Sequence, residues 1–236
     1  MSQNSDQRFD FIGLVAAILA ASMLLSIVTI AAPDQAAPAG QDAAVLDRIQ
    51  QHYQDTTSFS ARFTEELTGI GGAKRTRSGR VWYKRPGRMR WDFASPQKES
   101  VVADGHKLYD YQPDLNQVLE VPLERAFKSA APLAFLLGMG NLRHDFTASL
   151  PAPAGSESVL RVVLTPKGGG DRVEMTLNPS TCDLTGAKVT DALGNTTTIR
   201  FSDVRRNADI ADSMFRFEVP PGADVVQAPG TAPQRL

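Results

Sequence analysis

The sequence predicts one mainly β domain of the α+β class, in which the strands follow one another as an antiparallel meander. Apolar and polar residues alternate in many short segments after residue 58, and clusters of turn-forming residues separate these segments. Only two or three stretches have helical periodicity. Because no helical segment alternates with the strands as in a βα unit, sequence neighbours are expected to pair antiparallel.

An uncharged apolar run of 22 residues, 11–32, lies near the N-terminus. It is longer than the ~7–15 residues of a secretory signal core and long enough to span a bilayer. Ala37-Pro38-Ala39 then provides the small-x-small pattern that signal peptidase reads, with a cut before Gly40. We expect residues 1–39 to be a cleaved signal peptide or a retained membrane anchor, and residues 40–236 to form one exported domain.

Composition argues against a hydrolase or a metalloenzyme and against a nucleic-acid-binding protein. The chain has 25 Lys+Arg and 26 Asp+Glu, a formal net charge of −1, so it has no bulk attraction for polyanions. Its one cysteine, Cys182, cannot form an internal disulfide, and its three histidines are far apart in sequence. We therefore expect no metal and no cofactor, and we further expect no catalytic site and a monomeric protein.

The first predicted element of the exported part is a helix around residues 45–53, where apolar residues recur at helical spacing. The period then changes to two in SFSARFTEEL, residues 58–67. One face of this strand contains Phe59, Ala61, Phe63 and Leu67.

The later strands are recognised by the same alternation and by the turns between them. Asp104-Gly105 between two apolar runs predicts a tight hairpin, since a type I′ turn needs positive φ at both central residues. With the first strand this gives about ten or eleven strands. The others are GRVWYK (79–84), RMRWDF (88–93), VVA (101–103), KLYDY (107–111), QVLEV (117–121), VLRVVLT (159–165), RVEMTL (172–177), GAKVTD (186–191), TTTIRFSDV (196–204) and MFRFEV (214–219).

One later stretch, residues 123–137, has helical periodicity, interrupted by Pro132. The Pro/Ala-rich tail is expected to fray from Gly222. A sheet of this length curls, and helices of only ~25 residues are a thin cover for its concave face. Either the sheet closes on itself or a pocket remains between the sheet and the helices.

Six sequence segments occur in a fixed order over about residues 45–226. The more specific two are KRP-xxx-RW at residues 84–91 and, after it, DGxxLYxY. SFSARFTE precedes this pair, and APLAFLLG, LTPK and FRFEVPPGADVV follow it. With these segments the chain resembles the periplasmic outer-membrane lipoprotein carriers of the Lol pathway, the LolA-like family.

The resemblance implies an unclosed antiparallel half-barrel of about eleven strands, with two or three helices as a lid over an apolar cavity. It also implies a carrier in the periplasm of a Gram-negative bacterium, anchored to the inner membrane if residues 1–39 stay attached. Such a carrier takes triacylated lipoproteins from an inner-membrane ABC transporter and passes them to an outer-membrane receptor.

The resemblance further suggests roles for single residues. Arg85 matches the family arginine that holds the lid closed. Met89 matches a bulky apolar position involved in handing over the cargo, and methionine here replaces an aromatic residue. Flexible apolar side chains attract acyl chains without strict geometry, so we expect a cargo cavity formed by Phe63, Met89, Trp91, Leu108, Leu133 and Leu136.

Two alternative functions remain open on the sequence. One is a membrane-tethered lipid-handling protein, favoured if residues 11–32 are retained. The other is a periplasmic signalling sensor with the same half-barrel fold, although such sensors usually have a second C-terminal domain.

A basic cluster occupies residues 74–90, with no acidic residue between Glu66 and Asp92. It is either two solvated strand faces with a loop between them or a patch that meets anionic lipid headgroups or an acidic partner. Its members are Lys74, Arg75, Arg77, Arg80, Lys84, Arg85, Arg88 and Arg90.

Overall fold

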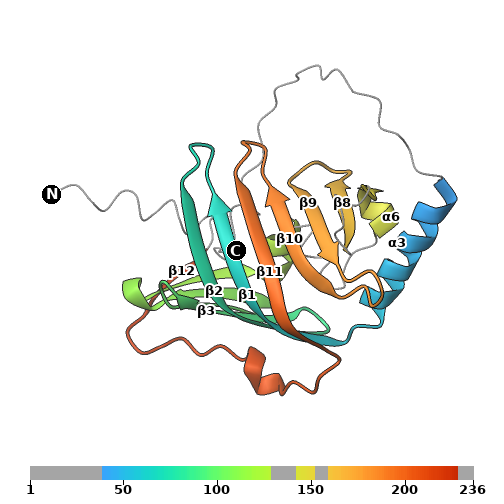
Figure 1. Ribbon diagram of the computed structural model, residues 1–236. Helices are drawn as coiled ribbons and strands as arrows, with labels where there is room; N and C mark the ends of the chain where they lie inside the picture. The colour runs from blue at the N-terminus through green and yellow to red at the C-terminus, as the bar shows by residue number, and fades with distance from the viewer. Residues whose placement is uncertain (1–38, 129–141, 152–158, 228–236) are drawn as a thin grey trace, which may run out of the picture.

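A computed structural model describes residues 39–128, 142–151 and 159–227. They form a single curled sheet of 12 strands, which stays open because the two end strands, β12 and β7, do not pair with each other (Figure 1). The spatial order is β12-β6-β5-β4-β3-β2-β1-β11-β10-β9-β8-β7. The predicted mainly β, unclosed half-barrel is therefore confirmed.

All neighbouring strands are antiparallel except β12, which runs parallel to β6. The period-two segments of the sequence account for most of them. The bounds are β1 Ser58–Thr68, β2 Lys74–Lys84, β3 Arg88–Ser95, β4 Glu99–Asp104, β5 Lys107–Gln112, β6 Gln117–Pro122, β7 Phe146–Ser149, β8 Leu160–Pro166, β9 Arg172–Leu177, β10 Leu184–Thr190, β11 Thr196–Arg206 and β12 Asp224–Gln227.

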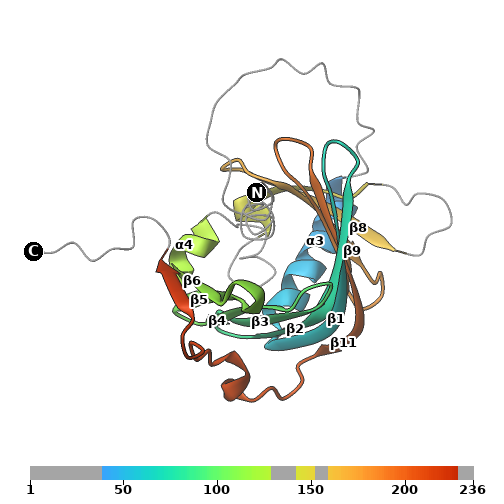
Figure 2. The same ribbon diagram turned by 90° about the vertical axis from the view of Figure 1, so that its left-hand side faces the viewer.

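The helices lie within the curve of the sheet, where α3 and α4 face its concave side (Figure 2). They are α3 Ala39–Gln54, α4 Leu123–Lys128 and α6 Leu142–Asp145. Two 3-10 turns are separate from these helices: η1 Pro113–Leu115 lies between β5 and β6, and η2 Asp212–Phe215 follows β11. The first part of the helix predicted at residues 123–137 is α4, and its remainder lies outside the described residues. Among the described helices, none has the length and apolar character needed to cross a membrane.

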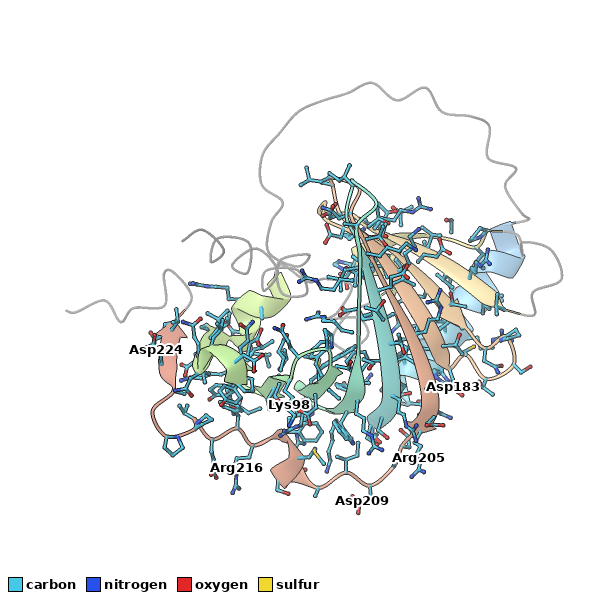
Figure 3. The ribbon with its side chains drawn as sticks, turned by 60° about the vertical axis from the view of Figure 1, so that its left-hand side comes forward. Lys98, Asp183, Arg205, Asp209, Arg216 and Asp224 are labelled. Carbon is cyan, nitrogen blue, oxygen red and sulfur yellow. The ribbon has the colours of Figure 1, made fainter. Side chains whose placement is uncertain are left out.

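The prediction of a strand at residues 214–219 is wrong. Residues 208–222, here called the C-terminal segment, contain η2 and then cross the convex face of the sheet without pairing in it; Figure 3 labels Asp209 and Arg216 along this path. Phe215 is buried, and the ring of Phe217 stacks on Tyr109 of β5 with centroids 5.0 Å apart. The alternation of apolar residues is real, but it reflects packing onto the sheet rather than backbone pairing.

Two short strands were not anticipated. β7 has only four residues, too few for its alternation to stand out. β12 lies in the tail that was expected to fray, yet its residues pair with β6 from Asp224↔Gln117 to Gln227↔Glu120. The expectation of fraying therefore does not hold for Asp224–Gln227.

The apolar side chains on the concave face form two hydrophobic cores rather than one. The first lies over β1–β6 and includes Leu123 and Ala126 of α4. The second lies over β8–β10 and includes Ile49 and Tyr53 of α3. Phe201 of β11 packs against both. The seam between the two cores therefore runs along the middle of the curled sheet.

A polar cluster interrupts the first core; we define it as Glu65, Arg77, Glu99 and Asp110. Glu65 of β1 and Arg77 of β2 are directly opposite, with 2.6 Å between Oε2 and Nε. The guanidinium passes over the Phe93 ring, 4.2 Å from its centroid, and its Nη1 donates to Glu99 Oε2 at 3.1 Å. One guanidinium thus joins two carboxyl groups on strands β1 and β4.

Burial disfavours the charged forms of two acids in this cluster. It raises the pKa of Asp110 well above its ordinary value, Glu99 adds to the rise, and Arg77 opposes it. Burial also raises the pKa of Glu99, against the influence of Arg77 and with that of Glu65. The core therefore contains an acid, Asp110, whose neutral form is favoured by its surroundings.

Gly79→Ala is expected to lower the free energy of unfolding by about 2 kcal/mol or more, because overpacking forces the backbone to shift. A Cβ at Gly79 would lie 2.0 Å from the backbone oxygen of Asp92 and 3.0 Å from Phe63 Cε1. Gly71→Ala is the control, since a Cβ there meets nothing within 4 Å. Urea denaturation measures both variants, and equal stability of the two would contradict this account of β2–β3 packing.

Asp110→Leu is expected to raise the free energy of unfolding by about 1–3 kcal/mol at pH 7.5, because it removes a buried acid that must stay protonated or pay for desolvation. A raised pKa in the fold means that the native state loses stability as pH rises from the ordinary value of 3.8 towards the raised one. The gain from the substitution should therefore shrink as pH falls towards 4.

The matched control for this prediction is Asp114→Leu, at an exposed acid in η1. Urea midpoints of the three proteins at several pH values give the comparison. A gain for Asp110→Leu that is the same at acidic and neutral pH would show that desolvation of the charged form is not what raises this pKa.

Candidate functional site

A cavity of about 70 Å³ lies at the seam between the two cores. Its wall combines side chains from the last turn of α3 with side chains from the concave face of β1, β2, β3, β10 and β11. The lining residues are His52, Tyr53, Thr56, Phe59, Val81, Tyr83, Met89, Trp91, Asp183, Leu184, Phe201 and Arg206.

Strand register brings the apolar part of this lining together. Tyr83 is opposite Met89, and Val81 is opposite Trp91, across the β2–β3 pair. Phe59 of β1 is opposite Tyr83. Since successive residues of a strand point to opposite faces, these odd-numbered positions all point to the concave side.

Two predicted cavity residues, Met89 and Trp91, line this cavity. Phe63 is buried behind it, with its ring 4.7 Å from that of Trp91. Leu108 is buried on the same face, two strands beyond Met89 in the row Met89↔Ala103↔Leu108. Two further predictions, Leu133 and Leu136, lie outside the described residues.

Sequence reasoning missed six apolar or aromatic members of the lining. Their signal was present for the first two strands: Phe59 shares the inward parity of Phe63, and Val81 and Tyr83 are alternate residues of GRVWYK. The positions missed are Tyr53, Phe59, Val81, Tyr83, Leu184 and Phe201.

Arg85 connects the two sides of the seam. It follows β2, and its Nη2 donates to the carbonyl oxygen of Tyr53 at 2.5 Å. The last carbonyls of a helix have no partner within the helix and carry its negative dipole end, so a guanidinium is well suited to them. The backbone N–H of Arg85 also donates to Thr57 O at 2.9 Å, which places the residue at the junction of α3 and β1.

The guanidinium of Arg85 is only partly satisfied. Its Nε is buried and has no hydrogen-bond partner. The Arg85 side chain also hydrogen-bonds the Tyr83 side chain. Burial raises the pKa of Tyr83 to about 12, and the positive charge of Arg85 and this hydrogen bond limit the rise. The attachment between the two cores is therefore not saturated with hydrogen bonds.

The surroundings of the lining histidine, His52, favour its uncharged form. Burial, helped by the nearby Arg206, lowers the pKa of His52. Its Nε2 lies 3.3 Å from Oδ1 of Asp183, which Figure 3 labels on the loop between β9 and β10. The cavity thus offers mainly apolar surface, with a polar margin where α3 meets this loop.

The basic cluster at residues 74–90 does not form one continuous free patch. Most of its members have partners on different faces of the sheet. Lys84 and Arg88 both bind Asp212 of the C-terminal segment, and they lower the pKa of that carboxyl. Further members with partners include Lys74 with Glu66, Arg77 with Glu65 and Glu99, Arg85 with Tyr53, and Arg90 with Asp92.

Comparison with known proteins supports one family. The model of the family "Outer membrane lipoprotein carrier protein LolA" matches residues 54–218. An outer-membrane lipoprotein carrier protein of Cupriavidus necator is 33% identical over 216 residues, covering 89% of this chain and 97% of that protein. One from Cupriavidus pinatubonensis is 35% identical over 191 residues, covering 78% of this chain and 88% of that protein.

Among solved structures, an uncharacterized conserved protein from Thermus thermophilus superposes with a TM-score of 0.50 at 14% identity, covering 81% of this chain and all of that one. At that identity the likeness concerns the fold alone. The extent of the family match and the sequence identity to the two carrier proteins establish the family without this structure. The chain belongs to the LolA family of outer-membrane lipoprotein carrier proteins.

Proposed function

We propose that this protein is a periplasmic carrier that binds the acyl chains of triacylated lipoproteins on its concave face. It would receive them from an inner-membrane ABC transporter and deliver them, as a monomer, to an outer-membrane receptor. The observation on which this rests is the apolar cavity at the seam between two cores, where Arg85 links β2 to α3.

The chemistry of the cargo requires such a surface. Each methylene of an acyl chain favours burial by ~0.8 kcal/mol, so a protein with several chains does not leave a membrane for water unaided. Apolar and aromatic side chains attract these chains in proportion to contact area, without a covalent step. Met89 adds a flexible, polarizable side chain to the cavity wall.

The size of the cavity implies a second conformation. At about 70 Å³ the cavity is too small for three acyl chains. Cargo would therefore separate the two cores at the seam. The described form is then the empty, closed one.

The Arg85–Tyr53 contact has a suitable strength for a reversible closure. A hydrogen bond to a charged group contributes about 1.5–3 kcal/mol, which burial of a few methylenes offsets. Closing would be favoured once the cargo leaves, because the apolar lining would otherwise meet water. Arg85 is accordingly proposed as the residue that holds the empty form closed.

Arg85→Leu is expected to shift the protein towards its loaded form, with about tenfold more lipoprotein retained per carrier and slower transfer to the receptor, because it removes one charged hydrogen bond. Arg85→Lys should be intermediate, since an ammonium donates without the planar fork. The control is Arg80→Leu, at an exposed arginine of β2, the strand that precedes Arg85. Native mass spectrometry of carrier purified from the periplasm measures the loaded fraction.

Two results would count against these proposals. Transfer by Arg85→Leu as fast as by the unmodified protein would remove the role of Arg85 in closure. A periplasmic pool containing only free phospholipid, with no lipoprotein bound one to one, would replace the carrier function by general lipid transport.

A further inference from the structure

We propose that the polar cluster Glu65, Arg77, Glu99 and Asp110 is a binding subsite for the polar linkage of an acylated cargo, namely its amide N–H and its amide or ester carbonyls. The proposal rests on the proposed carrier function and adds to it a means of recognition. The cavity at the seam would take acyl chain, and the cluster would take the group that joins the chains to the polypeptide.

Three polar atoms of this cluster are buried and have no hydrogen-bond partner: Glu65 Oε1, Arg77 Nη2 and Asp110 Oδ1. Glu65 and Asp110 are almost completely buried, at 0% and 1% exposure. Nearly all buried polar groups of native proteins are paired, so three unpaired atoms in one cluster indicate a partner that is absent from the empty protein. They leave Glu65 Oε1 as an acceptor, Arg77 Nη2 as a donor, and Asp110 Oδ1, which accepts when the proton of this acid is on Oδ2.

The cluster is placed where the head of a lipid would reach. Arg77 and Val81 share the concave face of β2 four residues apart, which is about 13 Å along the strand. The rings of Phe63 and Phe93, 5.1 Å apart, lie on the face between them. The concave face is therefore apolar at the seam and polar at this distance from it.

Asp110 extends the cluster across the sheet. It is opposite Val101, and Val101 is opposite Trp91, so Asp110 lies on the cross-strand row that begins in the cavity wall. Two strand spacings of ~4.8 Å separate it from Trp91. A ligand that contacts Trp91 with an acyl chain has Asp110 within reach of its polar end.

The charges of the cluster select the class of ligand. Arg77 already binds both Glu65 and Glu99, at 2.6 Å and 3.1 Å, so it has no excess positive charge for a carboxylate or a phosphate. Asp110 adds a third acid. The described residues contain no group of His, Cys, Asp or Glu side chains arranged to hold a metal ion. A neutral group that both donates and accepts hydrogen bonds fits this set best.

Among acylated molecules, this requirement separates lipids that have an amide from lipids that have only esters. An ester carbonyl can accept from Arg77 Nη2 but leaves Glu65 Oε1 and Asp110 Oδ1 unpaired. An N-acylated S-diacylglyceryl cysteine has ester carbonyls, amide carbonyls and amide N–H groups, and it can pair with all three atoms.

The test compares two lipids that have the same three chains. The purified full chain is titrated with a synthetic N-palmitoyl-S-dipalmitoylglyceryl-cysteinyl peptide and with tripalmitoylglycerol, which has no N–H. Asp110→Leu is expected to weaken binding of the lipopeptide about three- to tenfold and to change binding of tripalmitoylglycerol less than about twofold. Asp110→Asn, which keeps a carbonyl acceptor, should bind the lipopeptide in preference to tripalmitoylglycerol as the unmodified protein does. The exposed control Asp114→Leu should leave this preference unchanged.

A second measurement needs no variant. The side-chain carboxyl ¹³C resonance of Asp110 should shift when the lipopeptide is added to the unmodified protein, and not when tripalmitoylglycerol is added. This readout remains decisive if Asp110→Leu does not fold.

Three results would overturn the subsite. The first is that Asp110→Leu weakens binding of both lipids equally, and the second is that it weakens binding of neither. The third is that the Asp110 resonance of the unmodified protein stays unchanged with saturating lipopeptide. Tighter binding of a diacyl peptide with a free α-ammonium than of the N-acylated peptide would also overturn it, in favour of a cation site. Failure of the proposed carrier function is distinct, because it is read from a periplasmic pool without bound lipoprotein, whereas the subsite is judged by the Asp110 variants and the Asp110 resonance.

Discussion

A 12-stranded open sheet has more concave apolar surface than the short described helices can cover, and the rest of the structure follows from this mismatch. Each of α3 and α4 completes a core over its own part of the sheet. The two cores meet at Phe201, where packing is incomplete and a cavity remains. A fold that needed only stability would close such a seam, because incomplete packing forfeits dispersion contacts.

Most of the sheet could be predicted from the alternation of residues, because that pattern is fixed by which face of a strand is buried. Alternation does not tell whether the backbone is paired. For this reason the Phe215 and Phe217 stretch was predicted as a strand although it only packs on the convex face. The converse applies to Asp224–Gln227, where all four residues are exposed and pairing depends on the backbone alone.

The site was predictable in part for the same reason. Phe63, Met89, Trp91 and Leu108 were predicted as cavity residues, and the structure has all four buried on one face. The polar cluster obeys the same parity, since Glu65 occupies the inward position between Phe63 and Leu67, but a charged residue there was not considered as part of the site. The link from Arg85 to α3 joins residues 32 positions apart, and residue patterns alone do not specify such contacts.

The position of β12 has a consequence for how copies of the protein meet one another. An unpaired edge strand is a template on which a second chain can add a strand, and open sheets are exposed to that hazard. Here the chain returns across the convex face and places its own Asp224–Gln227 on the edge of β6. A four-residue strand with every side chain in solvent then forms the border, so the sheet ends in a short solvated margin that offers a neighbouring molecule little to extend.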